Sequence, residues 1–285
     1  MLNKVAIVTD STASLTEELL KEYNIYTSYL IIIFGNESYQ EFKELTPAKF
    51  LELSRSQKEL PSTSQPAIGL TVELYEKIFS DGYEEIIHVT ISSEISGSFQ
   101  SAVSAAEMVN KEKIHVFDSR ILVFPQGALA IEAAKMARDG KNASEIIPIL
   151  ERMRKHTNLT AAIKTLDNLK KGGRLSNAEA VIGGLLQIKP IVHLIESGKI
   201  EAAGKVRTFK KAIQFLIDTA RDANLDESYE FCVLNMENPE EGAILKDAIK
   251  ELYPTIKIHE LPLSLVVAAH VGPGAVAVSW IKNKI

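Results

Sequence analysis

Residues 92–98, which read SSEISGS, place several hydroxyl groups between a predicted strand and a predicted helix. The apolar run 85–89 before them is typical of a buried strand, and from Ser98 to Val109 Ala, Val and Met recur at helical spacing. Backbone N–H groups and the helix dipole favour an anion at such a helix start. Gly97 would let that anion approach the backbone closely. The alternative is that Ser96 and Ser98 only cap the helix.

A second polar cluster follows the first predicted strand. Residues 5–8, VAIV, are fully apolar and predict a central parallel strand, and Asp10 and Ser11 follow closely. Because ligands of open α/β sheets bind outside the carboxyl ends of the strands, both are candidate site residues. A plain turn before a helix explains them equally well, with Ser14 as the cap and Glu17 completing a capping box.

Residues 61–66, PSTSQP, form a stiff polar segment, because two prolines restrict the backbone on either side of Thr63 and Ser64. Polar residues held extended in this way could present their hydroxyl groups to a ligand. Such segments are also common in loops, so this one does not define a site by itself.

Ser96 and His270 are a candidate nucleophile and general base. A carboxylate that orients the histidine would be needed as well, and Asp10 and Asp118 are the candidates. The alternative for His270, which precedes a glycine turn, is a histidine that makes one backbone hydrogen bond. A serine hydrolase is therefore a possible but less favoured function.

Composition narrows the choice of partners. The 285 residues carry a net charge of −5, which argues against general nucleic-acid binding. The segment 164–211 differs, because it holds ten Lys or Arg against four Asp or Glu. Such a basic segment suits a phosphate or an acidic protein surface, although a solvated face is the default explanation.

Several chemistries are excluded by what the sequence lacks. The six histidines lie too far apart for a zinc motif, and neither a GxGxxG nor a Walker motif is present. The single cysteine, Cys232, cannot form an internal disulfide and lies in an apolar run, which fits core packing in a reducing cytoplasm. Without a signal segment or a bilayer-length apolar run, we expect a cytoplasmic protein with no stable membrane insertion.

The first half of the chain alternates predicted strands and helices, which indicates a parallel sheet covered by helices on both faces. We expect this three-layer α/β domain to span residues 1–158. Its predicted strands are 5–8, 25–34, 85–89 and 113–117, and its predicted helices are 14–23, 46–57, 70–79, 98–109, 121–139 and 144–156.

The second half, residues 159–285, has neighbouring hairpin strands between helices and predicts a two-layer α+β domain. Its predicted strands are 159–165, 190–195, 199–203, 230–235 and 256–259, with one more after the glycine turn at 270–274. Its predicted helices are 166–171, 177–187, 208–223 and 239–252. The predicted fold class is thus α/β, with a parallel-sheet domain followed by an α+β domain.

Six short motifs resemble those of the DegV family and occur in the family's order over essentially the whole chain. They are TDSTASL at 9–15, PSTSQP at 61–66, SSEISGSFQSA at 92–102, LKKGGRLS at 169–176, KVR at 205–207 and HVGPG at 270–274. One motif alone is weak, whereas six in order are highly specific for family and fold. The sequence SGSFQ departs from the SGTYQ of many relatives but keeps the hydroxyl and the ring.

Characterised members of that family bind fatty acids, and they include the carrier subunit of the bacterial fatty acid kinase. The resemblance implies one long-chain fatty acid in a buried tunnel between the two domains. Its carboxylate would be held by Thr63 and by Ser96 of the Ser96–Gly97 turn, with His270 in the same network. Arg174 and Arg207 would lie where the kinase docks. Asp10, Ser11 and Ser64 are secondary candidates for the site.

The resemblance also implies a role without catalysis of its own. A separate ATP-dependent kinase subunit would phosphorylate the bound carboxylate, and the acyl phosphate would feed phospholipid synthesis, with an acyltransferase as a further candidate partner. We expect no metal and no cofactor apart from the fatty acid. The alternatives are a serine hydrolase that uses Ser96 and His270, and a lipid-sensing scaffold protein.

Energetics indicate what such a tunnel must look like. Burying a dozen methylenes at ~0.8 kcal/mol each would contribute about 10 kcal/mol before the costs of binding. A charge-assisted hydrogen bond to the carboxylate adds about 1.5–3 kcal/mol, so the tail dominates affinity and the head group sets orientation. We expect walls of Leu, Ile, Val, Phe and Ala, with the apolar segments 178–186 and 121–124 as candidates, although ordinary core packing explains both segments as well.

Overall fold

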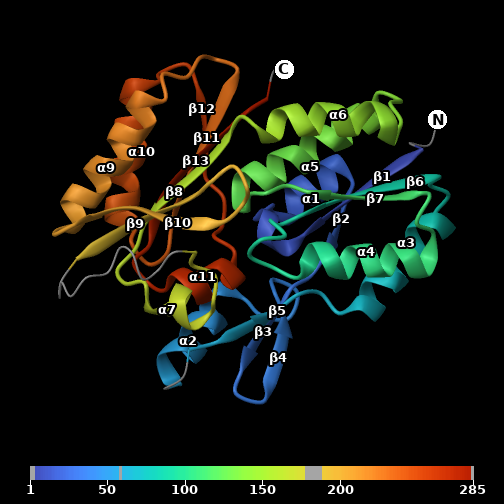
Figure 1. Cartoon of the computed structure of the whole chain (residues 1–285), viewed down its shortest axis with the longest axis horizontal. Coiled ribbons are helices and arrows are strands. Elements are labelled where there is room, and N and C mark those ends of the chain that lie inside the picture. The colour runs from blue at the N-terminus through green and yellow to red at the C-terminus, as the bar shows by residue number, and fades with distance from the viewer. Residues whose placement is uncertain (1–3, 58–59, 177–187, 284–285) are drawn as a thin grey trace.

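The structure is a computed structural model that describes residues 4–57, 60–176 and 188–283 (Figure 1). A four-stranded sheet in the order β2-β1-β6-β7 forms the first half, and all its neighbours pair in parallel. Its strands are β1 (Val5–Asp10), β2 (Ile25–Ser28), β6 (Glu85–Thr90) and β7 (Ile114–Asp118). Every residue of β1 is buried, because helices cover both faces of the sheet.

Alternate residues of β1 enter two different cores, which produces three layers. Ala6 and Val8 pack with Tyr75 of α3 (Ile68–Ser80) and with α4 (Ser98–Val109). Val5 and Ile7 pack in the core that contains α5 (Val123–Arg138) and α6 (Ala143–Arg154), with α1 (Glu17–Tyr23) against its edge. The predicted three-layer parallel-sheet domain is therefore confirmed.

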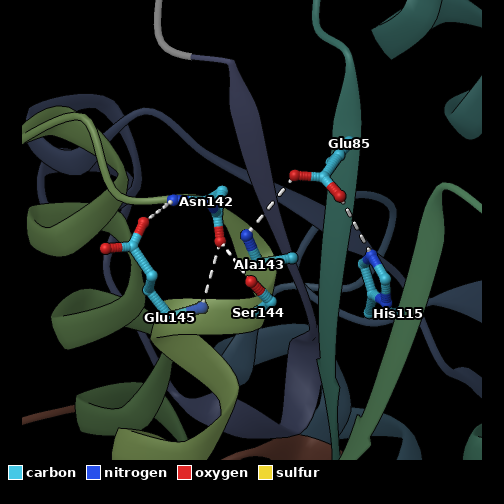
Figure 2. Close-up of polar contacts among 6 residues, drawn as sticks. All are labelled: Glu85, His115, Asn142, Ala143, Ser144 and Glu145. Carbon is cyan, nitrogen blue, oxygen red and sulfur yellow. Dashed lines mark hydrogen bonds and ion pairs between the residues drawn. The ribbon is translucent and has the colours of Figure 1, made fainter.

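Helix α6 begins at a capping box that also ties it to the sheet (Figure 2). The Glu145 backbone N–H donates to Oδ1 of Asn142 at 3.1 Å, and the Asn142 N–H donates to Oε2 of Glu145 at 3.0 Å. The carboxylate of Glu85, the first residue of β6, accepts from the Ala143 N–H at 3.4 Å and lies 3.3 Å from Nε2 of His115. These contacts fix the helix start against two strands of the parallel sheet.

A six-stranded mixed sheet in the order β10-β9-β8-β13-β11-β12 forms the second half. Helices α9 (Phe209–Asp222) and α10 (Pro239–Leu252) cover its outer face, where Phe231 and Trp280 are buried. Its strands are β8 (Thr157–Ala162), β9 (Lys189–Leu194), β10 (Ile200–Val206), β11 (Tyr229–Asn235), β12 (Lys257–His259) and β13 (Val276–Lys282). The predicted second domain of sheet and helices is confirmed as well.

The two sheets share one core. Cys232 and Leu234 of β11 and Ala277 of β13 pack in the same cluster as Leu129 of α5, so α5 lies between the parallel sheet and the inner face of the mixed sheet (Figure 1). Because β8 begins at Thr157, the second sheet starts close to the predicted division of the chain. The boundary after residue 158 itself stays a prediction.

A small antiparallel sheet, β4-β3-β5, lies beside both larger ones (Figure 1). The predicted strand 25–34 is wrong as one element, because the chain leaves β2 after Ser28 and enters β3 (Ile31–Phe34) in this other sheet. β3 pairs with β4 (Glu37–Gln40) and with β5 (Ser62–Ser64), which follows α2 (Pro47–Ser56). The stiff segment around Thr63 is thus a short edge strand.

Two other local predictions need correction. Ser14, with φ of 57°, ends the short 3₁₀ helix η1 (Ser11–Ala13), and the cap of α1 is Thr16, whose hydroxyl accepts from the Leu19 N–H at 3.4 Å. Helix α11 (Leu265–Val271) was not predicted, whereas the short helix α7 (Asp167–Lys171) was. The predicted helix 177–187 lies outside the described residues.

No helix in the described ranges combines the length and the apolar character needed to cross a membrane. Within the same ranges, no group of three His, Cys, Asp or Glu side chains could hold a metal ion. Cys232 is fully buried, and burial raises the pKa of its thiol to about 12.

Candidate functional site

A cavity lined mainly by aliphatic side chains lies between the two sheets. The space between its lining atoms is about 990 Å³, a value that includes the part open to solvent. None of its described lining residues is Phe, Tyr or Trp. Its apolar lining consists of Leu30, Ile91, Ile95, Leu122, Val123, Leu159, Ala161, Leu169, Val192, Leu194, Ile200, Leu234, Leu263, Val266, Val267, Val271, Ala275 and Ala277.

The inner face of the mixed sheet forms one wall of the cavity. Ala161 of β8 pairs with Val192 of β9 on one side and with Ala277 of β13 on the other, so these neighbouring side chains make a continuous apolar surface. Leu122 and Val123, at the start of α5, face it from the parallel-sheet side. This wall is a consequence of strand alternation, because the other face of the same strands packs on α9 and α10.

Of the two segments predicted to form cavity walls, 121–124 and 178–186, the structure describes only the first. Of residues 121–124, only Leu122 and Val123 line the cavity. Phe124 points elsewhere and packs on the ring of His259, with 4.5 Å between ring centroids. The segment 178–186 lies outside the described residues.

Polar residues from separate segments of the chain also line this cavity. Thr63 and Ser64 of β5, Ser96 and Gly97 before α4, and His270 of α11 all line it. Thr63 Oγ1 lies 2.7 Å from Nε2 of His270, across 207 positions of sequence. The structure therefore brings together the residues that the resemblance assigns to the carboxylate, from three segments far apart in the chain.

The turn before α4 is held by its own serines. The Ser98 N–H donates to Oγ of Ser96 at 3.2 Å, and the two hydroxyl oxygens lie 2.9 Å apart. Gly97 is the N-cap of α4 and makes no side-chain cap. A Cβ on Gly97 would lie 3.0 Å from Oε1 of Gln65, so glycine allows a close approach here. Ser96 thus orders the turn and also faces the cavity.

Glycines of the motifs LKKGGRLS and HVGPG position His270. A Cβ on Gly172, just after α7, would lie 2.7 Å from Nδ1 of His270, so only a glycine lets α11 pack this closely. Gly272, with φ of +74°, ends α11 against the side chain of Asn168. Burial and the nearby Arg174 guanidinium lower the pKa of His270 to about 4. The imidazole is therefore neutral at pH 7.

The geometry does not assemble a catalytic triad. Nε2 of His270 contacts Thr63, whereas Ser96 Oγ contacts Ser98. The carboxylate of Asp118 accepts from the Ser93 hydroxyl at 2.6 Å and from the Arg120 N–H at 3.0 Å. Neither Asp118 nor Asp10, which is described next, orients the histidine.

Asp10 and Ser11 do not line the aliphatic cavity and border a separate hollow instead. The buried Asp10 carboxylate accepts from the Ile91 N–H at 2.7 Å and from Nε2 of Gln126 at 2.9 Å. It also accepts from the N–H and the hydroxyl of Thr12. Burial raises the pKa of Asp10 despite these bonds. Its contacts join β1, the end of β6 and α5, which is a structural role.

Glu41 is a buried residue that sequence reasoning missed. Its carboxylate accepts from the Ser11 hydroxyl at 2.5 Å, the Ser264 hydroxyl at 2.6 Å and the Val266 N–H at 3.0 Å. Ser264 is the N-cap of α11, so Glu41 holds the start of the helix that carries His270. Burial raises the pKa of Glu41, and the charge of Asp10 adds to the effect. Glu41 lies in the chain between β4 and α2, and no sequence signal pointed to it.

The two predicted kinase-docking arginines lie apart. Arg174 lines the cavity, and its Nε donates to the Ile95 carbonyl at 3.2 Å while its Nη1 donates to the Gly172 carbonyl. Arg207 is exposed and follows the far end of β10, whose first residue, Ile200, bridges Leu175. At about 3.3 Å per residue, Arg207 is roughly 20 Å from that bridge.

The fold and sequence match known proteins over nearly their whole length. Residues 4–283 match the family described as "Uncharacterised protein, DegV family". A DegV domain-containing protein of Halalkalibacterium halodurans is 37% identical over 284 residues, which cover 99% of this chain and 100% of that protein. Both matches extend over both halves of the chain.

Two solved structures share the fold. The crystal structure of a fatty acid binding DegV family protein from Streptococcus agalactiae has a TM-score of 0.90 and 29% identity, and the match covers 99% of both chains. That of DegV, a fatty acid binding protein from Bacillus subtilis, has a TM-score of 0.87 and 36% identity, covering 98% of this chain and 99% of that one. Sequence and structure agree, and the chain belongs to the DegV family.

Proposed function

We propose that the chain binds one long-chain fatty acid, with its tail in the aliphatic cavity and its carboxylate at Thr63, Ser96 and His270. The observation that carries this proposal is a cavity with aliphatic walls whose lining also includes Thr63, Ser96 and the neutral His270. Because the described walls are aliphatic and contain no Phe, Tyr or Trp, they suit a flexible acyl chain better than a planar ligand. The fatty acid binding DegV proteins of Streptococcus agalactiae and Bacillus subtilis support the same ligand class.

The head-group end suits an anion that must remain reactive. Thr63 and Ser96 offer hydroxyl donors, and His270 is neutral because its pKa is lowered to about 4. Arg174 is the one cation among the described lining residues, and the guanidinium bonds given above go to two backbone carbonyls. Neutral donors orient a carboxylate without pairing it tightly to a cation, so its oxygen keeps its nucleophilic character.

The further step of this proposal is that the chain is the lipid-carrying, non-catalytic subunit of a kinase system. A carboxylate oxygen attacks the γ-phosphorus of ATP bound to a separate kinase, the bond to the ADP oxygen breaks, and an acyl phosphate and ADP result. The product would feed phospholipid synthesis through an acyltransferase. Arg174, which lines the cavity, and the exposed Arg207 are the proposed contacts of the kinase.

Mass spectrometry of an organic extract of the purified protein tests the ligand. We expect about one long-chain fatty acid per chain. Absence of any lipid, together with failure to bind added fatty acid, would refute the proposal. The combined variant Thr63→Val, Ser96→Ala should bind at least about 10-fold more weakly, because each charge-assisted bond contributes about 1.5–3 kcal/mol. Ser93→Ala is the matched control, since Ser93 lies in the same loop but does not line the cavity.

Acyl phosphate formation with a purified kinase subunit tests the carrier role. The same combined variant should form no acyl phosphate, even at fatty acid concentrations that saturate it. Arg207→Ala should keep fatty acid affinity and weaken kinase coupling, with Lys210→Ala as the control on the neighbouring exposed surface. Unchanged turnover by both variants would exclude these roles of Thr63, Ser96 and Arg207. A wild type that binds fatty acid but forms no acyl phosphate would leave the lipid-sensing scaffold as the function.

A further inference from the structure

A second hollow lies on the other side of the Thr63–His270 pair from the acyl cavity. Thr63, Arg174 and His270 line both spaces, so these side chains separate them. The hollow, which we call the vestibule, is also lined by Leu60, Pro61, Ser62, Asn168, Lys171, Gly172 and Ala269. Its lining is more polar than that of the acyl cavity and includes two cationic side chains.

The two cations of the vestibule are not neutralised within the described part of the chain. No described carboxylate forms an ion pair with Lys171 or Arg174, although nine Lys or Arg side chains form such pairs elsewhere in the described residues. Arg174 donates to backbone carbonyls, and Lys171 is exposed at the end of α7. An open hollow with unmatched positive charge favours an anionic ligand.

We propose that the vestibule binds the phosphoryl group of an acyl phosphate whose tail lies in the acyl cavity, with Lys171 as its main cationic contact. This assignment rests on the proposed function. Phosphorylation adds a dianionic group one bond beyond the carboxylate oxygen. Because Thr63 and His270 stand between the two spaces, a carboxylate held there places its new phosphorus atom on the vestibule side.

The chemistry fits the residues available. The carboxylate oxygen gains a bond to phosphorus that ATP on the kinase subunit provides, and ADP takes the electron pair of the broken bond. A lysine ammonium is a compact charge that suits phosphate oxygens. Asn168, which is part of the vestibule lining, offers an amide donor. The vestibule would hold the product on the carrier after the kinase leaves.

The test compares two ligands that share a tail. One is a saturated fatty acid, and the other is the matching 2-oxoalkylphosphonate, in which a methylene replaces the bridging oxygen of the acyl phosphate and prevents hydrolysis. Affinities are measured by calorimetry for the wild type, Lys171→Met and Lys170→Met. Lys170 is the matched control, because it is exposed and adjacent but does not line the vestibule.

We expect Lys171→Met to weaken phosphonate binding about 5- to 10-fold and to leave fatty acid affinity unchanged, whereas Lys170→Met changes neither. Equal effects of the two variants, or no effect of either, would overturn the vestibule assignment. Failure of the phosphonate to bind a wild type that binds the fatty acid would overturn it as well. If neither ligand binds the wild type, the proposed function itself fails. Inorganic phosphate added in competition shows whether the site needs the acyl tail.

Discussion

The Nδ1 atom of His270 packs against the backbone of Gly172 so closely that a Cβ at position 172 would lie 2.7 Å from it. This contact joins the end of α7 to α11. At the other end of α11, Glu41 holds the cap residue Ser264. The helix that brings His270 to the cavity is therefore fixed at both ends, by a glycine without a side chain and by a buried carboxylate.

Gly172→Ala should displace the imidazole of His270. The new methyl group cannot fit, so we expect a loss of about 1–3 kcal/mol in the free energy of unfolding and weaker fatty acid binding. In a His270→Ala background, Gly172→Ala should lower the free energy of unfolding much less. A double-mutant cycle by urea denaturation measures the coupling energy between the two positions.

Gly69→Ala is the control for this experiment. Gly69 lies within α3, and a methyl group added there would meet no atom within 4 Å, so alanine should be neutral or slightly stabilising. Additive effects of Gly172→Ala and His270→Ala would contradict the contact.

Glu41→Gln should change how stability depends on pH. Burial raises the pKa of Glu41, so the folded protein binds more protons than the unfolded chain between the ordinary value of 4.5 and the raised one. Wild-type stability from this group is therefore present below 4.5 and is lost as pH rises through that window. Glutamine does not titrate, so the variant should lack this loss.

Urea denaturation at a series of pH values checks the difference between the two proteins. Subtracting one curve from the other removes the contribution of titrating groups that do not interact with Glu41, whereas Asp10, whose charge acts on Glu41, does not cancel. Parallel curves above pH 4.5 would contradict the raised pKa of Glu41.

The imidazole of His270 should titrate near pH 4 in the ligand-free protein. Burial lowers its pKa, with a further contribution from Arg174. Between about 4 and the ordinary 6.5, the unfolded chain binds more protons at this residue, so its contribution to stability increases as pH rises. NMR of the imidazole protons measures the midpoint, and His270→Gln identifies the signal. A midpoint near 6.5 would mean that His270 is solvated and not packed on Gly172.

Ala161→Phe should shorten the longest acyl chain that fits. Ala161 lies in the middle of the apolar wall, between Val192 and Ala277. Each methylene that no longer fits loses ~0.8 kcal/mol, which is about 4-fold in affinity. Calorimetry with fatty acids of increasing length gives the cut-off for each protein. Thermal unfolding checks that the variant is folded. An unchanged cut-off in chain length would mean that the acyl tail does not lie against Ala161.

The sequence predicts the layers of this protein well, because they depend on local patterns. The apolar run of β1, the boundaries of α4 and α10, and the hairpin of β9 and β10 all follow from periodicity and turn residues. The six motifs also pointed to Thr63, Ser96 and His270, and all three line the same cavity, although their role in binding stays a prediction. Why a glycine stands at position 172 was not predicted, because the reason is a packing contact with a helix about 100 residues away.

The errors come from contacts that no local pattern encodes. The segment 25–34 reads as one strand, yet its two halves enter different sheets. Its first half, β2, pairs with β1, whereas its second half, β3, pairs with β4 and β5. Helix α11 has seven residues, too few for a clear helical period, and its start is held by Glu41 from more than 220 positions away. A buried carboxylate such as Glu41 looks like an ordinary surface residue in a sequence, and the burial of Asp10, a candidate site residue, was not predicted either.

The position of β13 has a consequence for synthesis on the ribosome. This strand occupies the middle of the mixed sheet, between β8 and β11, although its residues 276–282 are translated after all the other strands. Until then the sheet is split into β10-β9-β8 on one side and β11-β12 on the other, and the wall formed by Ala161 and Ala277 does not exist. On the proposed function, the cavity for the acyl chain is therefore complete only after translation has passed this strand.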